Sequence, residues 1–323
     1  MLHLRMITPP DLTDRVLELI GETVGTTHLV VLKGAARDPQ GDLVLCDVAR
    51  EAADELLQEV RAVGIYETGS VAVENIDLSI SRRADEAEEE APGEAADAVI
   101  WQQLGESTHE ESTLTITYAV FMIVATMIAA CGVVLDNAIL IVGAMAVGPE
   151  FGPLAGVCTG LVQRKPKSAG RSLLALLVGF AAAIAATTVF SLVMDALGQF
   201  HPGMLDNPRP NTSFIWQPDP FSFVVALLAG VAGMLSLTSA KAGALVGVAI
   251  SVTTVPAAAN AAVALSYGEF AQMRGSAEQL LLNLLGIIVA GTLTLIAWKL
   301  LWRTQQGRMI RKPGAPPRGQ GGF

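Results

Sequence analysis

The stretch that decides the fold class is residues 114–162, which read LTITYAVFMIVATMIAACGVVLDNAILIVGAMAVGPEFGPLAGVCTGLV. Only Asp136 and Glu150 are charged in this stretch. A helix of about 20 apolar residues is long enough to cross the roughly 30 Å hydrocarbon core of a bilayer. The stretch therefore predicts two membrane-spanning helices, Leu114–Leu135 and Ala138–Val162, which are joined by a turn at Asp136 and Asn137.

Four more stretches have a similar length and polarity, and they predict further spans at Ser172–Leu197, Phe221–Thr238, Ala242–Leu265 and Gln279–Trp302. Lys and Arg in short loops mark the cytoplasmic side of a membrane protein. Such residues gather at 164–171, at Lys241 and in a basic tail at 303–323, whereas the other side holds only Arg209 and Arg274. Six spans place all three basic positions and both termini inside, which predicts a multi-pass protein of the cytoplasmic membrane.

The composition agrees with a membrane protein that carries a soluble module. The 323 residues are 51% hydrophobic and 16% charged, against about 25% charged in a typical soluble domain. Residues 1–113 hold 8 Lys/Arg and 24 Asp/Glu, a net charge of −16, whereas residues 114–323 hold 13 and 7, a net charge of +6. This excludes a single soluble enzyme domain, and the lack of a basic patch outside the membrane flanks argues against a nucleic-acid partner. Cys46, Cys131 and Cys158 have neither metal-site spacing nor a disulfide framework.

Residues 1–81 predict a small cytoplasmic α+β domain. Its expected strands are Leu2–Ile7, Thr27–Lys33, Asp42–Val48 and Gly69–Ile76, and its expected helices are Pro10–Gly21 and Ala49–Val63. Residues Gly34–Gly41 contain Asp38-Pro39-Gln40-Gly41, a strong turn signal that leads into the third strand. The order βαββαβ is that of a ferredoxin-like unit. This fold serves many functions, so either a regulatory pocket for a small ligand or a plain assembly role is open. His3 and His28 are interpreted as isolated residues without a functional role.

Residues 82–113 predict an acidic linker. The like-charge run at 85–90 favours a solvated, disordered segment. A short helix is expected at Ala95–Gly105, and its Trp101 either anchors at the membrane interface or packs on the preceding domain.

Two of the predicted spans contain features that interrupt a helix. Pro149 and Pro153 lie near the middle of the second span, and Pro256 lies within the fifth. Proline removes a backbone donor and clashes with the preceding turn, so both spans are expected to break. Small residues in these spans favour close helix packing, namely Gly143, Gly148, Gly152, Gly156, Gly160, Gly243 and Gly247.

The two broken spans occupy matching places in two halves of three spans each, and 141–144 (IVGA) resembles 245–248 (LVGV). Halves with an odd number of spans have opposite orientations, and broken helices in such inverted repeats are typical of a transport site. The predicted central site comprises Pro149, Glu150, Pro153, Thr253, Thr254, Pro256 and Asn260. Glu150 would act as a proton or cation carrier, or it caps a half-helix or pairs with a neighbour structurally. Asp136 and Asn137 are secondary candidates, which turn chemistry also explains.

The run with Ala125-Thr126, Gly143-Ala-Met145 and Pro149-Glu-Phe-Gly-Pro153 is similar to a motif of a known family, and Gly247-Val-Ala-Ile250 followed by Val255-Pro256 resembles that family's second signature. On these motifs the chain resembles the uncharacterised hydrophobic membrane proteins grouped as domain of unknown function 389. Many members have Ser-Pro-Leu-Met-Gly-Pro where this chain has Gly148-Pro149-Glu150-Phe151-Gly152-Pro153. The resemblance implies a membrane protein and supplies neither a substrate nor an activity.

The sequence thus favours a membrane transporter or channel-like permeation protein for a small solute or ion, with a cytoplasmic regulatory or assembly domain. The alternative is a membrane-anchored sensor or scaffold whose cytoplasmic domain binds a ligand or partner. An intramembrane enzyme is disfavoured because the spans contain no His/Glu metal pair, Ser–His pair or paired aspartates. No cofactor is expected, and the small-residue ridge predicts either homo-oligomers or packing within one subunit.

Overall fold

The computed structural model describes residues 1–91, 93, 98–217, 220–238 and 253–306, which form two compact units. The first contains the described part of 1–102 together with Thr238 and residues 299–306, and the second contains the described parts of 103–237 and 241–298. The first part of the predicted fifth span, with Gly243 and Gly247, and the end of the basic tail lie outside the described residues.

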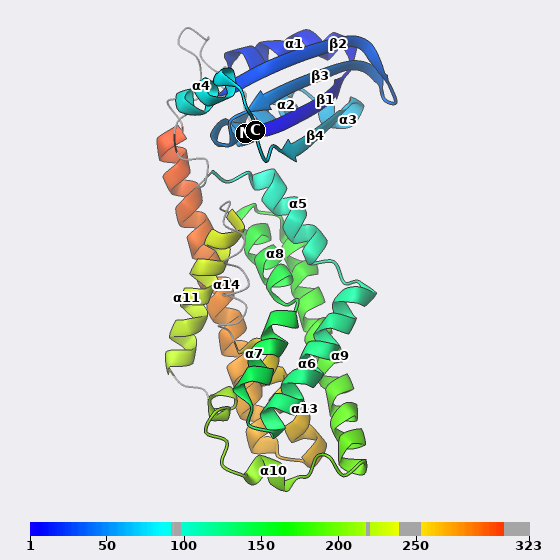
Figure 1. Cartoon of the computed structure of the whole chain (residues 1–323), viewed down its shortest axis with the longest axis vertical. Helices are drawn as coiled ribbons and strands as arrows, with labels where there is room; N and C mark the ends of the chain where they lie inside the picture. Colours follow the sequence, from blue (N-terminus) through cyan, green and yellow to red (C-terminus); the bar gives the residue numbers. More distant parts are fainter. Residues whose placement is uncertain (92, 94–97, 218–219, 239–252, 307–323) are drawn as a thin grey trace. The chain divides into compact units, whose positions relative to one another are not determined.

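The first unit is built on a four-stranded antiparallel sheet with the order β2-β3-β1-β4 (Figure 1). Its elements are β1 (Leu2–Thr8), α1 (Pro10–Glu22), β2 (Thr26–Arg37), β3 (Gln40–Val48), α2 (Arg50–Ala62), α3 (Ile65–Thr68) and β4 (Ser70–Asn75). The predicted elements occur in the predicted order, and α3 is an addition. The predicted turn occurs at Asp38-Pro39, and β2 extends beyond the predicted Lys33 to Arg37, which pairs with Gln40 of β3.

The core of this unit follows from the alternation of strand residues. Leu2, Leu4 and Met6 of β1 are almost fully buried and belong to one cluster with Val16 of α1 and Leu56 of α2. Side chains two apart in a strand point to the same face, so one face of the sheet faces the two helices. Cys46 of β3 lies in the same cluster, where burial and, secondarily, the nearby Asp47 carboxylate raise the pKa of its thiol to about 12.

The linker is more ordered than predicted. Its acidic run lies in helix α4 (Arg82–Glu90), which buries Ala84 and Ala87 while its glutamates stay exposed. The expectation of disorder was wrong, since alanines three apart give this charged segment an apolar stripe that packs near β2. The next helix, α5 (Trp101–Glu111), begins later than the predicted Ala95–Gly105 and ends later as well.

The second unit is helical. Its elements are α6 (Ile116–Val134), α7 (Ala138–Val147), α8 (Phe151–Val162), α9 (Pro166–Ala196), α10 (Gly203–Asp206), η2 (Ser213–Ile215), α11 (Pro220–Thr238), α13 (Thr254–Tyr267) and α14 (Phe270–Gln306). Four of these helices, α6, α9, α11 and α14, are long and apolar enough to cross a membrane. The pair α7 and α8 makes a fifth span if it is counted as one, so several apolar helices support a membrane protein.

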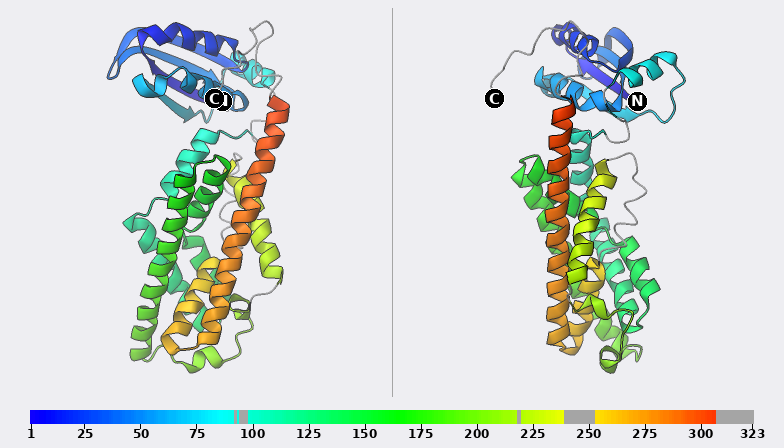
Figure 2. Two further views of the ribbon diagram at one scale, coloured as in Figure 1. Left: turned by 180° about the vertical axis from the view of Figure 1, so that it is seen from behind. Right: turned by 90° about the vertical axis from the view of Figure 1, so that its left-hand side faces the viewer.

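Two helices begin earlier than hydropathy predicts. α9 starts at Pro166 rather than Ser172, and α14 starts at Phe270 rather than Gln279. Apolar windows mark only the part of a helix that fits the hydrocarbon, whereas the helix itself continues into polar surroundings. Figure 2 shows α14 as an uninterrupted helix beside α11. Gly230 of α11 and Gly286 of α14 each face the opposite helix at contact distance, which allows the close approach.

Candidate functional site

The second predicted span is broken in the structure, as its prolines predict. α7 ends at Val147, α8 begins at Phe151, and the two axes are bent by 51°. Gly148 is the C-cap residue of α7, and Glu150 is the N-cap residue of α8. Pro153 lies in the first turn of α8, where proline is tolerated because the amide that it lacks would have no helical partner.

Glu150 is buried at this break, with only 4% of its surface exposed. One carboxylate oxygen, Oε1, accepts a hydrogen bond of 2.8 Å from the hydroxyl of Thr254. The other oxygen, Oε2, is buried and has no hydrogen-bond partner among the described residues. Gly148 lies directly against it, and a Cβ at this position would overlap Glu150 Oε2. The backbone of the break therefore has no space for any side chain larger than glycine beside the carboxylate.

Thr254 is the first residue of α13, so the Glu150–Thr254 bond joins the starts of two helices. Pro256 is the third residue of α13, as Pro153 is the third residue of α8. The first amides of a helix lack internal partners and carry a partial positive charge, which favours a negative group nearby. The sequence placed Glu150, Thr254 and the two prolines in one site, and the structure brings Glu150 and Thr254 into direct contact.

A row of buried polar side chains on α14 extends from this pair. Asn283 donates to Thr253 Oγ1 at 2.9 Å, and Gln279 donates to Asn283 at 3.5 Å. Further along α14, Ser276 accepts a hydrogen bond of 2.7 Å from Asn260. We call Gln272, Ser276, Gln279 and Asn283 the α14 polar row, and all four are buried.

Asn260 belongs to a second polar cluster at the far end of this row. The guanidinium of Arg209 donates to Asn260 Oδ1 at 3.0 Å and to Gln272 Oε1 at 2.6 Å. The sequence analysis used Arg209 only as one of the two basic residues on the non-cytoplasmic side of the predicted topology. In the structure it is buried, with 6% of its surface exposed. No hydrogen bond between Asn260 and Glu150 occurs in the described structure, so the predicted central site consists of two groups that α14 connects.

Sequence reasoning missed the α14 polar row. Its members follow spacings of four, three and four residues, which place them on one face of a helix. This spacing can be read from the sequence, but the predicted span began at Gln279 and therefore left Gln272 and Ser276 in a loop.

Asp136 and Asn137 have structural roles at the turn between α6 and α7. Asn137 caps α7 by accepting hydrogen bonds from the amides of Ile139 and Leu140. Asp136 adopts a left-handed backbone conformation, and its carboxylate accepts a hydrogen bond of 2.9 Å from the hydroxyl of Thr212. These contacts hold the turn and the loop around Thr212 together, as turn chemistry explains.

The glycines of the predicted ridge contact other parts of the same chain. Gly156 lies against Ser112 and Ser172, and Gly160 lies against Ala169 of α9. Gly148 is not part of a helical ridge, because it lies in the break. Gly143 has open space around it.

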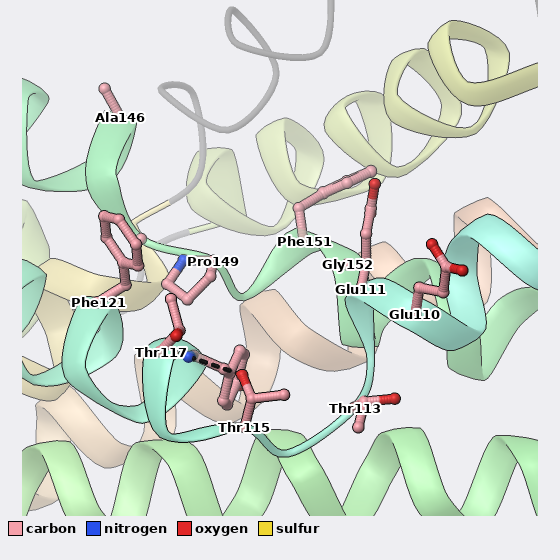
Figure 3. Close-up of a pocket in the computed structure, with 12 residues that line it drawn as sticks. Glu110, Glu111, Thr113, Thr115, Thr117, Phe121, Ala146, Pro149, Phe151 and Gly152 are labelled. Carbon is pink, nitrogen blue, oxygen red and sulfur yellow. Dashed lines mark hydrogen bonds between the residues drawn. The ribbon is translucent and has the colours of Figure 1, made fainter.

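A pocket of about 400 Å³ opens beside the break. Its walls come from the end of α5, the start of α6 and the residues that flank Glu150, and its lining residues are Glu110, Glu111, Thr113, Thr115, Thr117, Tyr118, Phe121, Ala146, Gly148, Pro149, Phe151 and Gly152. Figure 3 shows Glu110 and Glu111 on one side of this space and Phe121 and Pro149 on the other. We call it the Glu110 pocket.

The first unit holds a polar cluster that the sequence did not predict. The Nδ1 atoms of His3 and His28 each lie 2.7 Å from a carboxylate oxygen of Asp47, and His28 Nε2 lies 2.9 Å from the hydroxyl of Ser81. The two histidines are therefore not isolated. They are 25 residues apart in the sequence, and they come together because β1 and β2 both pair with β3, which carries Asp47. Among the described residues no group of three or more His, Cys, Asp or Glu side chains is arranged to hold a metal ion.

Comparison with known proteins confirms the resemblance noted in the sequence. Residues 145–289 match the family described as "Domain of unknown function (DUF389)". The chain is also similar to "Uncharacterized protein MJ0678" of Methanocaldococcus jannaschii, at 24% identity over 226 residues that cover 68% of each chain. No solved structure matches. The matched region includes Glu150, Thr254, Asn260 and about the first half of α14, and it carries no assigned function.

Proposed function

We propose that this chain is a membrane transporter or channel-like permeation protein for a small solute or ion, and that its N-terminal unit is a regulatory or assembly domain on the cytoplasmic side. The observation that carries this proposal is the buried Glu150 at the junction of α8 and α13, with one oxygen bonded to Thr254 and the other without a partner among the described residues. A carboxylate is costly in the interior of a membrane protein, so its presence points to a role in moving charge.

The surroundings of Glu150 support permeation rather than a purely structural role. Capping a helix or pairing with one hydroxyl would not require the polar row that α14 extends from Thr253 to Asn260. A membrane-anchored sensor or scaffold predicts a dry, well-packed interior without a midplane cavity. The Glu110 pocket opens beside the break, and residues on both sides of Glu150 line it, which gives a ligand access to the neighbourhood of the carboxylate.

The proposal includes six spans arranged as two inverted halves. α13 has 14 residues, about 21 Å at 1.5 Å per residue, so it crosses only part of a bilayer. Like α8, it starts at the junction with a proline in its third position, which is the relation expected of equivalent half-helices. Loop charges then place both termini in the cytoplasm. Homo-oligomers stay a prediction, since Gly156 and Gly160 are occupied by contacts within the chain.

The test is proton flux into proteoliposomes that enclose a pH-sensitive dye, with potassium and valinomycin present to balance charge. We expect the wild-type protein to dissipate an imposed pH gradient faster than empty liposomes do. Glu150→Gln keeps the size of the side chain and its bond to Thr254 but cannot ionise, so we expect a loss of about tenfold or more in the pH-dependent flux.

The matched control is Glu278→Gln, which removes an exposed carboxylate from α14 that pairs with Arg274 at the surface. We expect it to retain wild-type flux. Equal flux in the wild-type protein and in Glu150→Gln would remove Glu150 from the mechanism and leave the proposed function without its main support.

A further inference from the structure

We propose that the Glu110 pocket is a binding site for a small organic ammonium ion. This deepens the proposed function by naming the chemistry of a ligand beside the break. The inference that the bound cation crosses the membrane rests on the proposed function. The inference that the pocket binds the cation does not, because binding is independent of transport.

The charge of the pocket favours a cation. Its charged lining residues are Glu110 and Glu111, and no Lys, Arg or His lines it within the described part of the chain. Glu111 lies close to the start of α8, since a Cβ on Gly152 would be 2.8 Å from Glu111 Cβ. Glu150 adds a third carboxylate behind the wall, since its Oε2 lies against Gly148, which lines the pocket. Carboxylates on one wall with no compensating base attract a positive ligand and repel an anion.

The remaining walls favour an organic cation over a bare metal ion. A volume of about 400 Å³ is in the range of small-molecule pockets and far exceeds the space that one metal ion fills. Phe121 is 50% exposed, and Tyr118 and Phe151 supply two more rings to the lining. The faces of aromatic rings attract alkylated ammonium groups, whereas metal ions require several converging oxygen or nitrogen ligands.

Tyr118 lines the pocket with part of its ring and is 94% buried. Its hydroxyl is buried against Gly179 of α9, which does not line the pocket, so this hydroxyl belongs to the contact between α6 and α9. The features of the pocket that select a ligand are therefore its carboxylates and its rings, and a quaternary ammonium ion is the simplest probe of both.

The test is equilibrium binding of radiolabelled choline to the purified full chain in a maltoside detergent, which contains no ammonium group. We expect saturable binding that unlabelled choline displaces. The neutral analogue 3,3-dimethylbutan-1-ol has nearly the same shape and lacks the charge, so we expect it to compete at least about tenfold more weakly. The double variant Glu110→Gln/Glu111→Gln should weaken choline binding by about tenfold.

Two matched variants control for surface charge and ring content. Glu106→Gln changes an exposed carboxylate on the same helix α5, and Phe221→Leu removes an exposed ring on α11. Both should bind choline like the wild-type protein, whereas Phe121→Leu should bind it several-fold more weakly. A lack of saturable binding, equal competition by the neutral alcohol, or wild-type affinity in the double Gln variant would each overturn the proposal without affecting the flux test of Glu150.

A second competition experiment distinguishes a soluble ammonium ion from the ammonium group of a lipid head group. A short-chain phosphatidylcholine presents the same head group on a lipid. Displacement of labelled choline by this lipid at much lower concentration than by choline assigns the pocket to a lipid head group, and the reverse order assigns it to a soluble cation. Both results support the ammonium site.

The pH dependence of choline affinity separates a direct role of the Glu111 charge from a purely structural role of this residue. A structural role would not change that dependence. The titratable groups at the pocket are Glu110 and Glu111 of α5, Tyr118 of α6 and, behind the wall, Glu150. Burial raises the pKa of the Glu111 carboxyl above its ordinary value. Choline does not titrate, so its affinity should fall as the pH decreases through this raised pKa, and the fall should be smaller in Glu111→Gln.

Discussion

Glu150 has a position that only specific contacts make tolerable. An ionised carboxylate away from water requires hydrogen bonds or positive charge nearby. Here the hydroxyl of Thr254 and the first turns of α8 and α13 supply both. The arrangement leaves Oε2 available, so the side chain is held in place without being fully satisfied. A group in this condition can exchange one partner for another at low cost.

This balance predicts the effect of removing the Thr254 hydroxyl. Thr254→Val keeps the shape of the side chain and deletes the donor to Glu150. Losing a hydrogen bond to a charged group costs about 1.5–3 kcal/mol, so we expect a decrease of this size in the free energy of unfolding, measured by denaturation of the purified protein.

The control for this prediction is Thr294→Val, because Thr294 donates only to the carbonyl of Ala290 in its own helix. We expect it to cost much less. In the Glu150→Gln background, Thr254→Val should cost clearly less than in the wild type, since the amide keeps a hydrogen bond to Thr254 but carries no charge. Additive effects in this double-mutant cycle would show that the charge of Glu150 adds nothing to the bond.

The residue types of this site were predictable, and their pairing was not. Proline and glycine around an intramembrane carboxylate indicate a break from the sequence alone. The bond from Glu150 to Thr254 joins residues 104 positions apart, and no local pattern encodes it. Arg209 shows the same limit, because its charge suggested a loop at the membrane surface while its guanidinium is buried against Asn260.

Among the elements, α8 depends on small side chains for its close packing. It is buried along nearly its whole length, and its glycines meet neighbouring segments at short distance. A Cβ on Gly160 would lie 2.7 Å from the backbone nitrogen of Ala169. Because backbone atoms of α9 cannot move aside as a flexible side chain does, the contact fixes how closely the two helices approach.

This contact predicts the outcome of adding one methyl group. Gly160→Ala should destabilise the protein by about 1–3 kcal/mol through overpacking, although alanine is the better helix former. Gly143→Ala on α7 is the matched control, since a Cβ there meets nothing within 4 Å. We expect it to be neutral or slightly stabilising in thermal denaturation. Equal effects of the two substitutions would show that α8 and α9 are not packed as closely as described.

The elements also show why periodicity predicts some boundaries and misses others. Pro166, the first residue of α9, marks the start of that helix directly, and Pro153 in the first turn of α8 marks its start to within three residues. The start of α14 carries no such mark, and its polar residues lowered the hydropathy that defined the span. The spacing of these polar residues, three and four apart, is the better guide to the start of α14. It indicates that they share one face of a helix, and in the structure that polar face is buried.

At the scale of the whole molecule, the number of spans determines where each end lies. Four single helices and the bent α7–α8 pair give at most five spans among the described residues. Five spans would put the segment at 164–171 and the chain beyond α14 on opposite sides of the membrane. Six spans, which include the predicted fifth span Ala242–Leu265, would put them on the same side.

The two topologies differ in the accessibility of single cysteines. In a variant without Cys46, Cys131 and Cys158, we place one cysteine at a time at His201, Lys167 or Arg308 and treat intact cells with an impermeant maleimide. Six spans predict labelling at His201 alone, because the loop after α9 is then outside while Lys167 and the tail are inside. Labelling at both His201 and Arg308 would indicate five spans. It would also remove the inverted repeat, because the second half would then have an even number of crossings and could not be the reversed counterpart of the first.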